Sequence, residues 1–418
     1  MKSEARMIDA VDRAVAFYEE PPTEDTAVET SWDEVELSAA DWDQAFAAPE
    51  PGTPHNEARA EIREELLAIL VDKHDPDVPT EALRRELSAD RELMGMLDRA
   101  WPLLDPGDVV GDLWEVPAYL RLCAPWLDEQ ERRRLRRGGP QAWTAPDLPL
   151  LDAARRRLGD AGSERRRRRQ DAAVAARRQR MADVVDDLVA GDDSDMLTMS
   201  MLRGSDLDAV LVDDAVGDDA LRDPLAGPFA HVVVDEAQEL TDAQWRMVLA
   251  RCPSRSLTVV GDRAQARGGF AESWEERLAR VGLTAVRAAS LTVNYRTPEE
   301  VMAAAEPVIR AVLPDANVPT SIRRGGAPVE YRPAAERDAI LDAWLAEHDQ
   351  GTACVLGDPT YPGIDRVRSL SPVEAKGLEF DLVLLAEPAP SGDPVTDAVD
   401  RYVAMTRATQ RLVILERR

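Results

Sequence analysis

The spacing of apolar residues divides the chain into a helical amino-terminal part and a carboxy-terminal part of alternating strands and helices. From residue 56 to about residue 104, apolar side chains such as Ile62, Leu66 and Ile69 recur every three or four positions, which predicts amphipathic helices. After Gly227, short apolar runs alternate with helical stretches, as in a parallel α/β sheet. The expected strands lie near residues 229–234, 256–261, 288–293, 328–332, 352–356, 381–386 and 411–415.

One predicted helix has an unusually clear start. Directly after Arg296, Thr297 is suited to cap a helix and Pro298 to occupy its first position. Glu300 is then placed to complete a capping box with Thr297. We therefore expect a capped helix immediately after the Tyr295-Arg296 pair.

Changes of composition predict five segments. Residues 1–54 are acidic and contain prolines, which indicates one helix followed by irregular chain. Residues 55–190 form a mostly α-helical domain, with Trp101, Trp114, Trp126 and Trp143 interpreted as core anchors rather than a ligand cage. Its arginine tract at 155–189 predicts a long helix that is either solvated or contacts nucleic acid or a polymerase. Residues 191–227 read as an acidic loop, and residues 228–290 and 291–418 carry the strand pattern.

Charge and composition restrict the class of protein. The chain has 51 Lys and Arg against 79 Asp and Glu, a net charge of -28, which disfavours general attraction to polyanions and favours a basic protein partner. Its apolar runs are too short to cross a bilayer, and its amino terminus lacks a signal-peptide core, so we expect no membrane contact and a cytoplasmic location. Cys123, Cys252 and Cys354 lack metal-ligand spacing, and we expect them to be buried structural residues.

Acidic and amide residues follow two neighbouring predicted strands. The run HVVVDEAQELT ends an apolar strand in Asp235 and Glu236, and SLTVVGDRAQ ends another in Asp262 with Gln265 three residues later. Carboxylates at the ends of buried strands are used by nucleotide hydrolases to hold Mg²⁺ and to orient the attacking water. Taken alone, an Asp-Glu pair after a strand is weak evidence and more often marks a solvated strand end.

Three further motifs follow in order: LTVNYRTPEE, VEAKGLEFDLVLL and YVAMTRATQRLVIL. Together with DEAQ and GDxxQ they resemble motifs II to VI of UvrD/Rep-like superfamily-1 helicases, over residues 228–418. Upstream, PHNEAR, AWPLLDP and AWTAPDLPLLDAARRRLG resemble the insertion of HelD proteins, helicase relatives that bind bacterial RNA polymerase. The resemblance implies two RecA-like parallel sheets, the first incomplete and the second complete, preceded by a helical insertion domain.

The resemblance also implies roles for individual residues, with ATP and Mg²⁺ as ligands. Asp235 would hold the metal, Glu236 would orient water, and Gln265 would sense the γ-phosphate. Arg296 and Arg407 would act as arginine fingers. Tyr295 would stack on adenine, while Gly377 and Glu379 would contact the nucleotide, the latter at the ribose.

The glycine-rich phosphate loop of the family is missing from the pattern. None of the three lysines, Lys2, Lys73 and Lys376, follows a Gly-rich turn ahead of Ser or Thr. We therefore expect a separate chain to supply this Walker A half, or the protein to be a remnant. In motif V, Val373 and Glu374 replace the small polar residues that helicases place against the nucleic-acid backbone, which makes processive translocation on DNA doubtful.

Three functional readings follow. The leading one is a HelD-like protein that binds RNA polymerase and couples ATP binding or hydrolysis to the release of DNA or RNA, with the acidic residues around Asp192 entering the polymerase channel or forming a linker. The first alternative is a non-catalytic polymerase-binding remnant. The second is a subunit of a 3'-5' DNA helicase. Enzymatic activity is left open, because it requires the missing phosphate loop.

Overall fold

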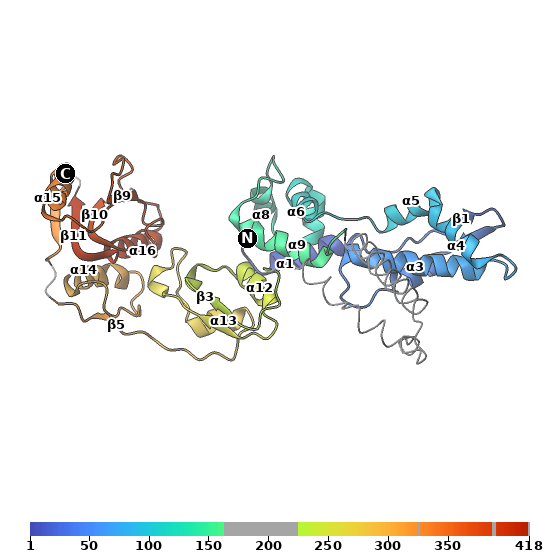
Figure 1. The fold of residues 1–418 in the computed structure, drawn as a ribbon, viewed down its shortest axis with the longest axis horizontal. Helices are drawn as coiled ribbons and strands as arrows, with labels where there is room; N and C mark the ends of the chain where they lie inside the picture. The colour runs from blue at the N-terminus through green and yellow to red at the C-terminus, as the bar shows by residue number, and fades with distance from the viewer. Residues whose placement is uncertain (163–224, 325–326, 387–389, 417–418) are drawn as a thin grey trace, which may run out of the picture. The chain divides into compact units, whose positions relative to one another are not determined.

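The computed structural model describes residues 1–162, 225–324, 327–386 and 390–416 (Figure 1). The chain separates into two compact units, one drawn from residues 1–228 and 241–253 and the other from residues 229–240 and 254–418. Most of the predicted arginine tract and acidic loop fall between residues 163 and 224, outside the described residues. In its described part the chain is helical first and forms parallel sheets later, the α/β order that the apolar spacing predicts.

The first unit is built mainly of helices. Its elements are α1 (Arg6–Ala16), β1 (Thr26–Glu29), β2 (Glu34–Leu37), α2 (Ala39–Phe46), α3 (His55–Lys73), α4 (Thr80–Ala89), α5 (Arg91–Ala100), α6 (Pro106–Glu115), α7 (Pro117–Cys123), α8 (Glu129–Leu135), α9 (Leu148–Leu158) and α12 (Asp242–Arg251). Side-chain caps start several of them: Ser38, Asp128 and Thr241 each form a reciprocal capping box. These caps supply partners for the first backbone N–H groups of each helix.

Two hydrophobic cores hold this unit together. One lies among α1, α6, α7, α9 and α12 and contains the buried Trp114. The other joins α2, α3, α4 and α5 to the β1–β2 hairpin and contains the buried Trp101. Trp126 and Trp143 pack partly buried against the first core. The interpretation of these tryptophans as core anchors is confirmed.

The amino-terminal segment is more regular than its composition predicts. Residues 26–37 form an antiparallel hairpin in which Val28 is paired with Val35. Both side chains are buried with Leu37 in the core formed by α2 to α5, while the acidic residues between them point to solvent. The prediction of irregular chain after the first helix was wrong here, because this short polar and apolar alternation has the period of a strand.

A buried ionic cluster fixes the amino terminus of the first unit. Asp147 is fully buried, and its carboxylate accepts hydrogen bonds from Lys2 Nζ at 2.7 Å, Arg137 at 2.9 Å and the Thr144 hydroxyl at 2.6 Å. Lys2 also lies 4.7 Å from the centre of the Trp114 ring. Burial alone would raise the pKa of Asp147, but the hydrogen bonds from Lys2, Thr144 and Arg137 outweigh it and lower the pKa to about 2.

Asp147→Asn should therefore lower the free energy of unfolding of the first unit by about 2 kcal/mol at neutral pH. Because the folded pKa lies below the ordinary value of 3.8, this contribution is present above that value and is lost as the pH falls towards 2. Urea unfolding followed by tryptophan fluorescence at several pH values measures it, since most tryptophans belong to this unit. An unfolding difference that persists unchanged at the lowest pH would contradict the assignment.

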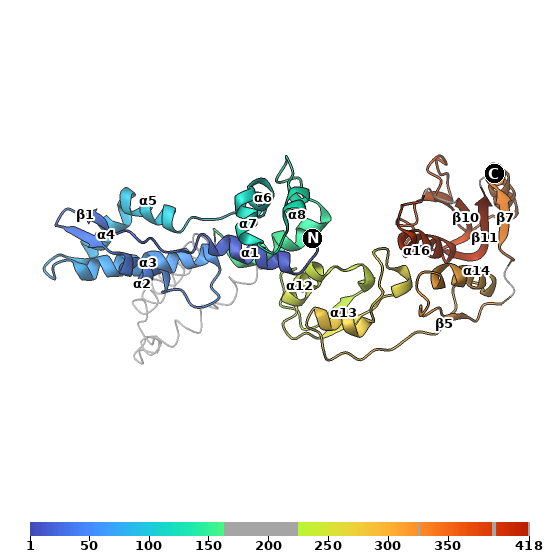
Figure 2. The ribbon, with the colours of Figure 1, turned by 180° about the vertical axis from the view of Figure 1, so that it is seen from behind.

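The second unit contains a five-stranded parallel sheet. Its strands are β7 (Glu330–Pro333), β8 (Ala353–Leu356), β9 (Val367–Leu370), β10 (Phe380–Ala386) and β11 (Ala408–Glu416), in the order β7-β11-β10-β8-β9. Helices α14 (Glu299–Arg310) and α16 (Pro394–Met405) cover one face, and α15 (Arg337–Glu347) covers the other. Both views show α16 beside β10 (Figures 1 and 2). From Leu382 onward, successive residues of β10 face opposite cores, so this part of the strand is apolar on both faces.

Two smaller parallel pairs precede this sheet. Strand β3 (Val232–Val234) pairs with β4 (Leu257–Val259), which α13 (Trp274–Arg280) follows. Strand β5 (Val293–Asn294) pairs with β6 (Thr320–Ser321). The strand expected at 288–293 was wrong, since residues 288–292 are not in a strand, and β6 and β9 were not predicted. Two- and four-residue strands carry too few alternating positions to be recognised from sequence alone.

The predicted capping box of α14 was also wrong. The helix begins at Glu299, Pro298 occupies the cap position, and no side chain caps it. Thr297 is buried, and its hydroxyl donates to the carbonyl of Thr406 at 3.4 Å instead of bonding the helix. The hydroxyl is thus used to join the start of α14 to the end of α16.

The three cysteines are buried, and no described helix meets the requirements of a membrane span. Cys123, Cys252 and Cys354 are all buried, as expected. Burial raises the pKa of the Cys123 thiol to about 11 and that of Cys354 to about 12, which keeps both unreactive at neutral pH. Among the described helices, none has both the length and the apolar character needed to span a bilayer.

Candidate nucleotide-binding site

Strand β3 delivers the two predicted carboxylates to a tight turn. Asp235 and Glu236 follow Val234 directly and are both exposed. Glu236 has a φ of 50° and a ψ of 36°, a left-handed conformation that is costly for a residue with a Cβ. The Asp235 carboxylate accepts the Glu236 N–H at 2.8 Å, which stabilises this turn. The chain therefore reverses direction at the two acidic residues and leaves their side chains in solvent.

Gln238 joins the ends of β3 and β4. Its buried side-chain amide donates to the Glu236 carboxylate at 2.5 Å, and its side-chain oxygen accepts the Asp262 N–H at 3.1 Å. A Cβ on Gly261 would lie 2.7 Å from this oxygen and from the Trp274 ring, so only glycine fits there. Sequence reasoning assigned Gln238 no role, although it is the last residue of DEAQ. It positions Glu236.

Gln265 is held by its own loop rather than pointing freely outward. Its amide donates to the Asp262 carboxylate at 2.9 Å. Burial raises the pKa of Asp262, against the hydrogen bonds from Gln265 and from the Ala264 N–H; the negative charge of Glu236 raises it further and the positive charge of Arg407 lowers it. Asp262 is therefore within electrostatic range of both Glu236 and Arg407.

Lys376 connects the acidic turn to the AKGLEF loop. Its ammonium pairs with Glu239 and donates to the Gln265 carbonyl at 2.9 Å. Gly377 follows with a φ of 73° and open space around its α-carbon. The loop before β10 is thus tied to the ends of both β3 and β4, a contact that sequence reasoning missed.

Arg296 and Glu379 form an ion pair with each other. Arg296 Nε lies 2.7 Å from the Glu379 carboxylate, and both side chains are more than two-fifths exposed. The Asn294 side-chain oxygen accepts the N–H groups of Arg296 and Thr297, which fixes the chain between β5 and α14. Tyr295 next to it is 78% exposed, so its ring is available to a planar partner.

Arg407 lies at the end of α16 and is only 4% exposed. Its Nε donates to the Val403 carbonyl at 3.1 Å. Burial lowers the pKa of Arg407, the positive charge of Arg296 lowers it further, and Glu236 and Glu379 oppose both effects. Arg407 therefore lies within electrostatic range of Arg296 and of two carboxylates, that of Glu236 after β3 and that of Glu379 before β10.

The predicted site residues thus divide into two sets. The fold brings Glu236, Gln265, Arg296, Glu379 and Arg407 into one region of the second unit. Asp235, Tyr295 and Gly377 border that region, and Asp235 is joined to it by the hydrogen bond that its carboxylate accepts from the Glu236 N–H. Within the described ranges no three His, Cys, Asp or Glu side chains converge on one metal position.

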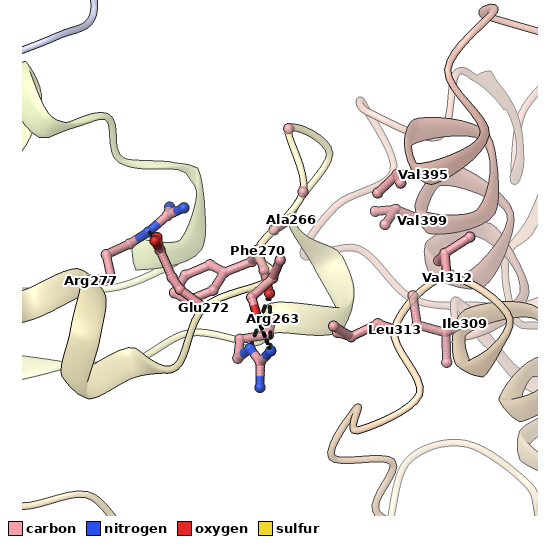
Figure 3. Close-up of a pocket in the computed structure, with 13 residues that line it drawn as sticks. Arg263, Ala266, Phe270, Glu272, Arg277, Ile309, Val312, Leu313, Val395 and Val399 are labelled. Atoms are coloured by element: carbon pink, nitrogen blue, oxygen red, sulfur yellow. Dashed lines mark hydrogen bonds and ion pairs between the residues drawn. The ribbon is translucent and has the colours of Figure 1, made fainter.

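A pocket of about 350 Å³ lies beside this region (Figure 3). On one wall the Phe270 ring lies against the Arg277 guanidinium, 3.9 Å from the ring centre, and Arg263 donates to the Phe270 carbonyl. The opposite wall is apolar and comes from α14, the residues after it, and α16. Sequence reasoning did not mark Phe270, because a single aromatic residue in a loop carries no periodic signal.

Comparison with protein families gives a match to residues 217–416 of the chain. This range matches the model of the viral superfamily 1 RNA helicase core domain. The carboxy-terminal part of the chain is similar to a superfamily-1 helicase core. The matched range of this helicase-like core contains every residue of the candidate site, from Asp235 to Arg407. A search of curated proteins gave no match.

Among solved structures, the chain matches viral helicases at low identity. Arterivirus nonstructural protein 10, a helicase, is 20% identical over 44% of this chain and 38% of that protein, with a TM-score of 0.28. Its complex with DNA is 19% identical over 46% and 41%, with a TM-score of 0.30. The PRRSV helicase is 17% identical over 44% and 34%, with a TM-score of 0.29. The chain therefore spans between 34% and 41% of these helicases.

Proposed function

We propose that this chain is the helicase-like part of a HelD-type ATPase that binds RNA polymerase and promotes release of nucleic acid. The observation that carries the ATPase proposal is the position of buried Arg407, within range of Glu236, Arg296 and Glu379. Two arginines opposite acidic residues suit a γ-phosphate flanked by metal and water.

In this proposal each residue acts on bound nucleotide. Glu236 orients the attacking water, and Gln238 keeps its carboxylate in place. When nucleotide binds, Arg296 releases Glu379 and donates hydrogen bonds to phosphate oxygens instead. Glu379 is then free to accept a hydrogen bond from a ribose hydroxyl. Gln265 reads the γ-phosphate, Gly377 allows close backbone approach, and Tyr295 stacks on the base.

The acidic turn also fits a magnesium ion. Mg²⁺ binds through one or two carboxylates and completes its shell with water and substrate phosphates, so Asp235 with Glu236 nearby is a sufficient protein contribution. When bound, the ion would neutralise charge developing on the phosphates. Asp235 is the residue that would hold it, because its carboxylate is exposed directly beyond the strand.

We further propose that the phosphate loop comes from another polypeptide. Val233 of β3 is 67% exposed and Val260, just beyond β4, is 48% exposed. Parallel strands are normally covered on both faces and at their edges, so an apolar face on the two-stranded β3–β4 pair favours a covering chain. A strand carrying Gly-Lys-Thr beside β3 or β4 would bring its lysine near Glu236.

Nucleic acid is the proposed second ligand. The wall formed by Phe270, Arg263 and Arg277 combines an aromatic ring with guanidinium groups, a combination suited to stacked bases. Glu374 opposes tight backbone binding: Ser371 donates two hydrogen bonds to its carboxylate and lowers its pKa, so it stays charged at neutral pH. This favours action on a polymerase complex over a 3'-5' DNA helicase subunit.

Equilibrium binding of Mg-ATP tests the proposal, with the chain alone and with a polypeptide carrying the Gly-Lys-Thr loop. Binding that requires the second polypeptide supports the split ATPase. If ATP binds under neither condition while the chain still retains RNA polymerase in a pull-down, the non-catalytic polymerase-binding reading replaces it. Failure to retain polymerase, with ATP and DNA binding intact, favours a helicase subunit.

A further inference from the structure

A second pocket, distinct from the proposed nucleotide site, lies at the amino-terminal end of β11. It has a volume of about 400 Å³ and is lined by Pro298, the arginines after β6, the end of α15 and the first residues of β11. Every charged residue in the lining is basic: Arg323, Arg324 and Arg411, with His348 beside them. In a chain with a net charge of -28, a pocket lined by arginines and no carboxylate selects anions.

The arginines of this pocket are held in place. Arg411 donates from Nε to Glu330 at 2.9 Å and lies 2.7 Å from it through a terminal nitrogen. Arg323 donates to the Arg296 carbonyl at 3.0 Å. A guanidinium carries several N–H donors, so each retains donors for a ligand after these bonds. Pre-positioned guanidinium groups lose less entropy when they bind an anion.

In the described part of the chain, the acidic groups around the pocket leave one of its arginines without an ion pair. Glu330 is matched by Arg411, and Glu299 lies 3.5 Å from Arg324, with both of the latter side chains largely in solvent. Asp381 accepts hydrogen bonds from Gln410, Thr409 and the Thr352 N–H. Arg323 has no acidic partner among the described residues, so it is the residue whose charge is available.

Aromatic and imidazole groups close the remaining side. The rings of His348 and Trp344 stack with centres 4.9 Å apart. His348 Nδ1 lies 2.9 Å from the Trp344 carbonyl, which can only accept, so Nδ1 carries the hydrogen. The guanidinium of Arg366 lies 5.8 Å from the Trp344 ring centre and donates to the His348 carbonyl, which adds positive charge behind the pocket.

We propose that this pocket binds a phosphate group, with Arg323 as its principal ligand and Arg324 and Arg411 beside it. Planar guanidinium groups bind phosphate oxygens through paired hydrogen bonds, and Thr409 and Gln410 line the same space. The phosphate belongs either to a nucleic-acid backbone or to a free oligophosphate. The site goes beyond the proposed ATPase, since it contains none of the residues assigned to ATP.

The test uses the full chain and two probes, inorganic pyrophosphate measured by calorimetry and a fluorescent oligothymidylate measured by anisotropy. Arg323→Ala should weaken binding roughly tenfold, as expected for the loss of one charge-assisted contact. Arg323→Lys, which keeps the positive charge but not the planar set of N–H donors, should lose less affinity. Arg287→Ala is the matched control, because Arg287 is exposed and does not line the pocket.

The two probes distinguish the source of the phosphate. A loss of affinity for both probes, together with a slope of log binding constant against log salt concentration that falls by about one for the oligonucleotide, supports a backbone phosphate. A loss of affinity for pyrophosphate alone supports a free oligophosphate as the ligand. Equal affinities of Arg323→Ala and Arg287→Ala for both probes would overturn the proposal. Mg-ATP binding, measured in parallel, reports separately on the proposed nucleotide site.

Discussion

Arg407→Ala should reduce ATP turnover about a thousandfold, measured with the chain and a polypeptide that supplies the phosphate loop. Arg407 is buried at the end of α16 and held through Nε by the Val403 carbonyl, so its remaining nitrogens have a fixed direction. A guanidinium that is already held in place, within electrostatic range of Arg296 and Glu236, requires little reorganisation when charge develops on the γ-phosphate.

Arg407→Lys separates the contribution of charge from that of geometry. Lysine keeps the positive charge but cannot bridge two oxygens, so most of the turnover should still be lost. Arg287→Ala serves as the control, because it removes one exposed arginine of the same unit. If Arg407→Ala turned over ATP at the rate of this control, Arg407 would be a structural residue and the proposed site would have to be abandoned.

Glu236→Gln should reduce ATP turnover between about a hundredfold and ten thousandfold while ATP binding remains. The substitution preserves side-chain shape and leaves an oxygen that still accepts the hydrogen bond from Gln238. It removes the negative charge that orients water, but no group assigned to the base or the ribose. The expected result is a nucleotide-bound chain that hydrolyses very slowly.

Single-turnover measurements make this test specific. They separate binding from the chemical step, which a steady-state rate does not. Glu275→Gln is a suitable control, because Glu275 is an exposed carboxylate of α13 that takes no part in the site. Loss of ATP binding together with turnover would show instead that Glu236 holds the turn in place, and would move the role of orienting water to another group.

The site could be predicted only as a set of residue types in order. DEAQ and GDxxQ are local patterns at the ends of neighbouring parallel strands, which lie at one edge of a sheet, so their proximity was expected. The Arg296–Glu379 pair and the burial of Arg407 were not predictable, because each depends on side chains from elements far apart in the sequence. The roles assigned to these residues remain predictions.

By itself, the sequence determined where helices give way to parallel strands, that Trp101, Trp114 and the three cysteines are buried, and which motifs carry carboxylates and arginines. Periodicity records burial within one element, so these features are visible one segment at a time. Only the tertiary structure decided that Thr297 bonds Thr406 instead of capping α14, that Gln238 and Lys376 join the strand ends, and that arginines from separate elements line one pocket. Such contacts depend on the spatial approach of distant segments, which no local pattern contains.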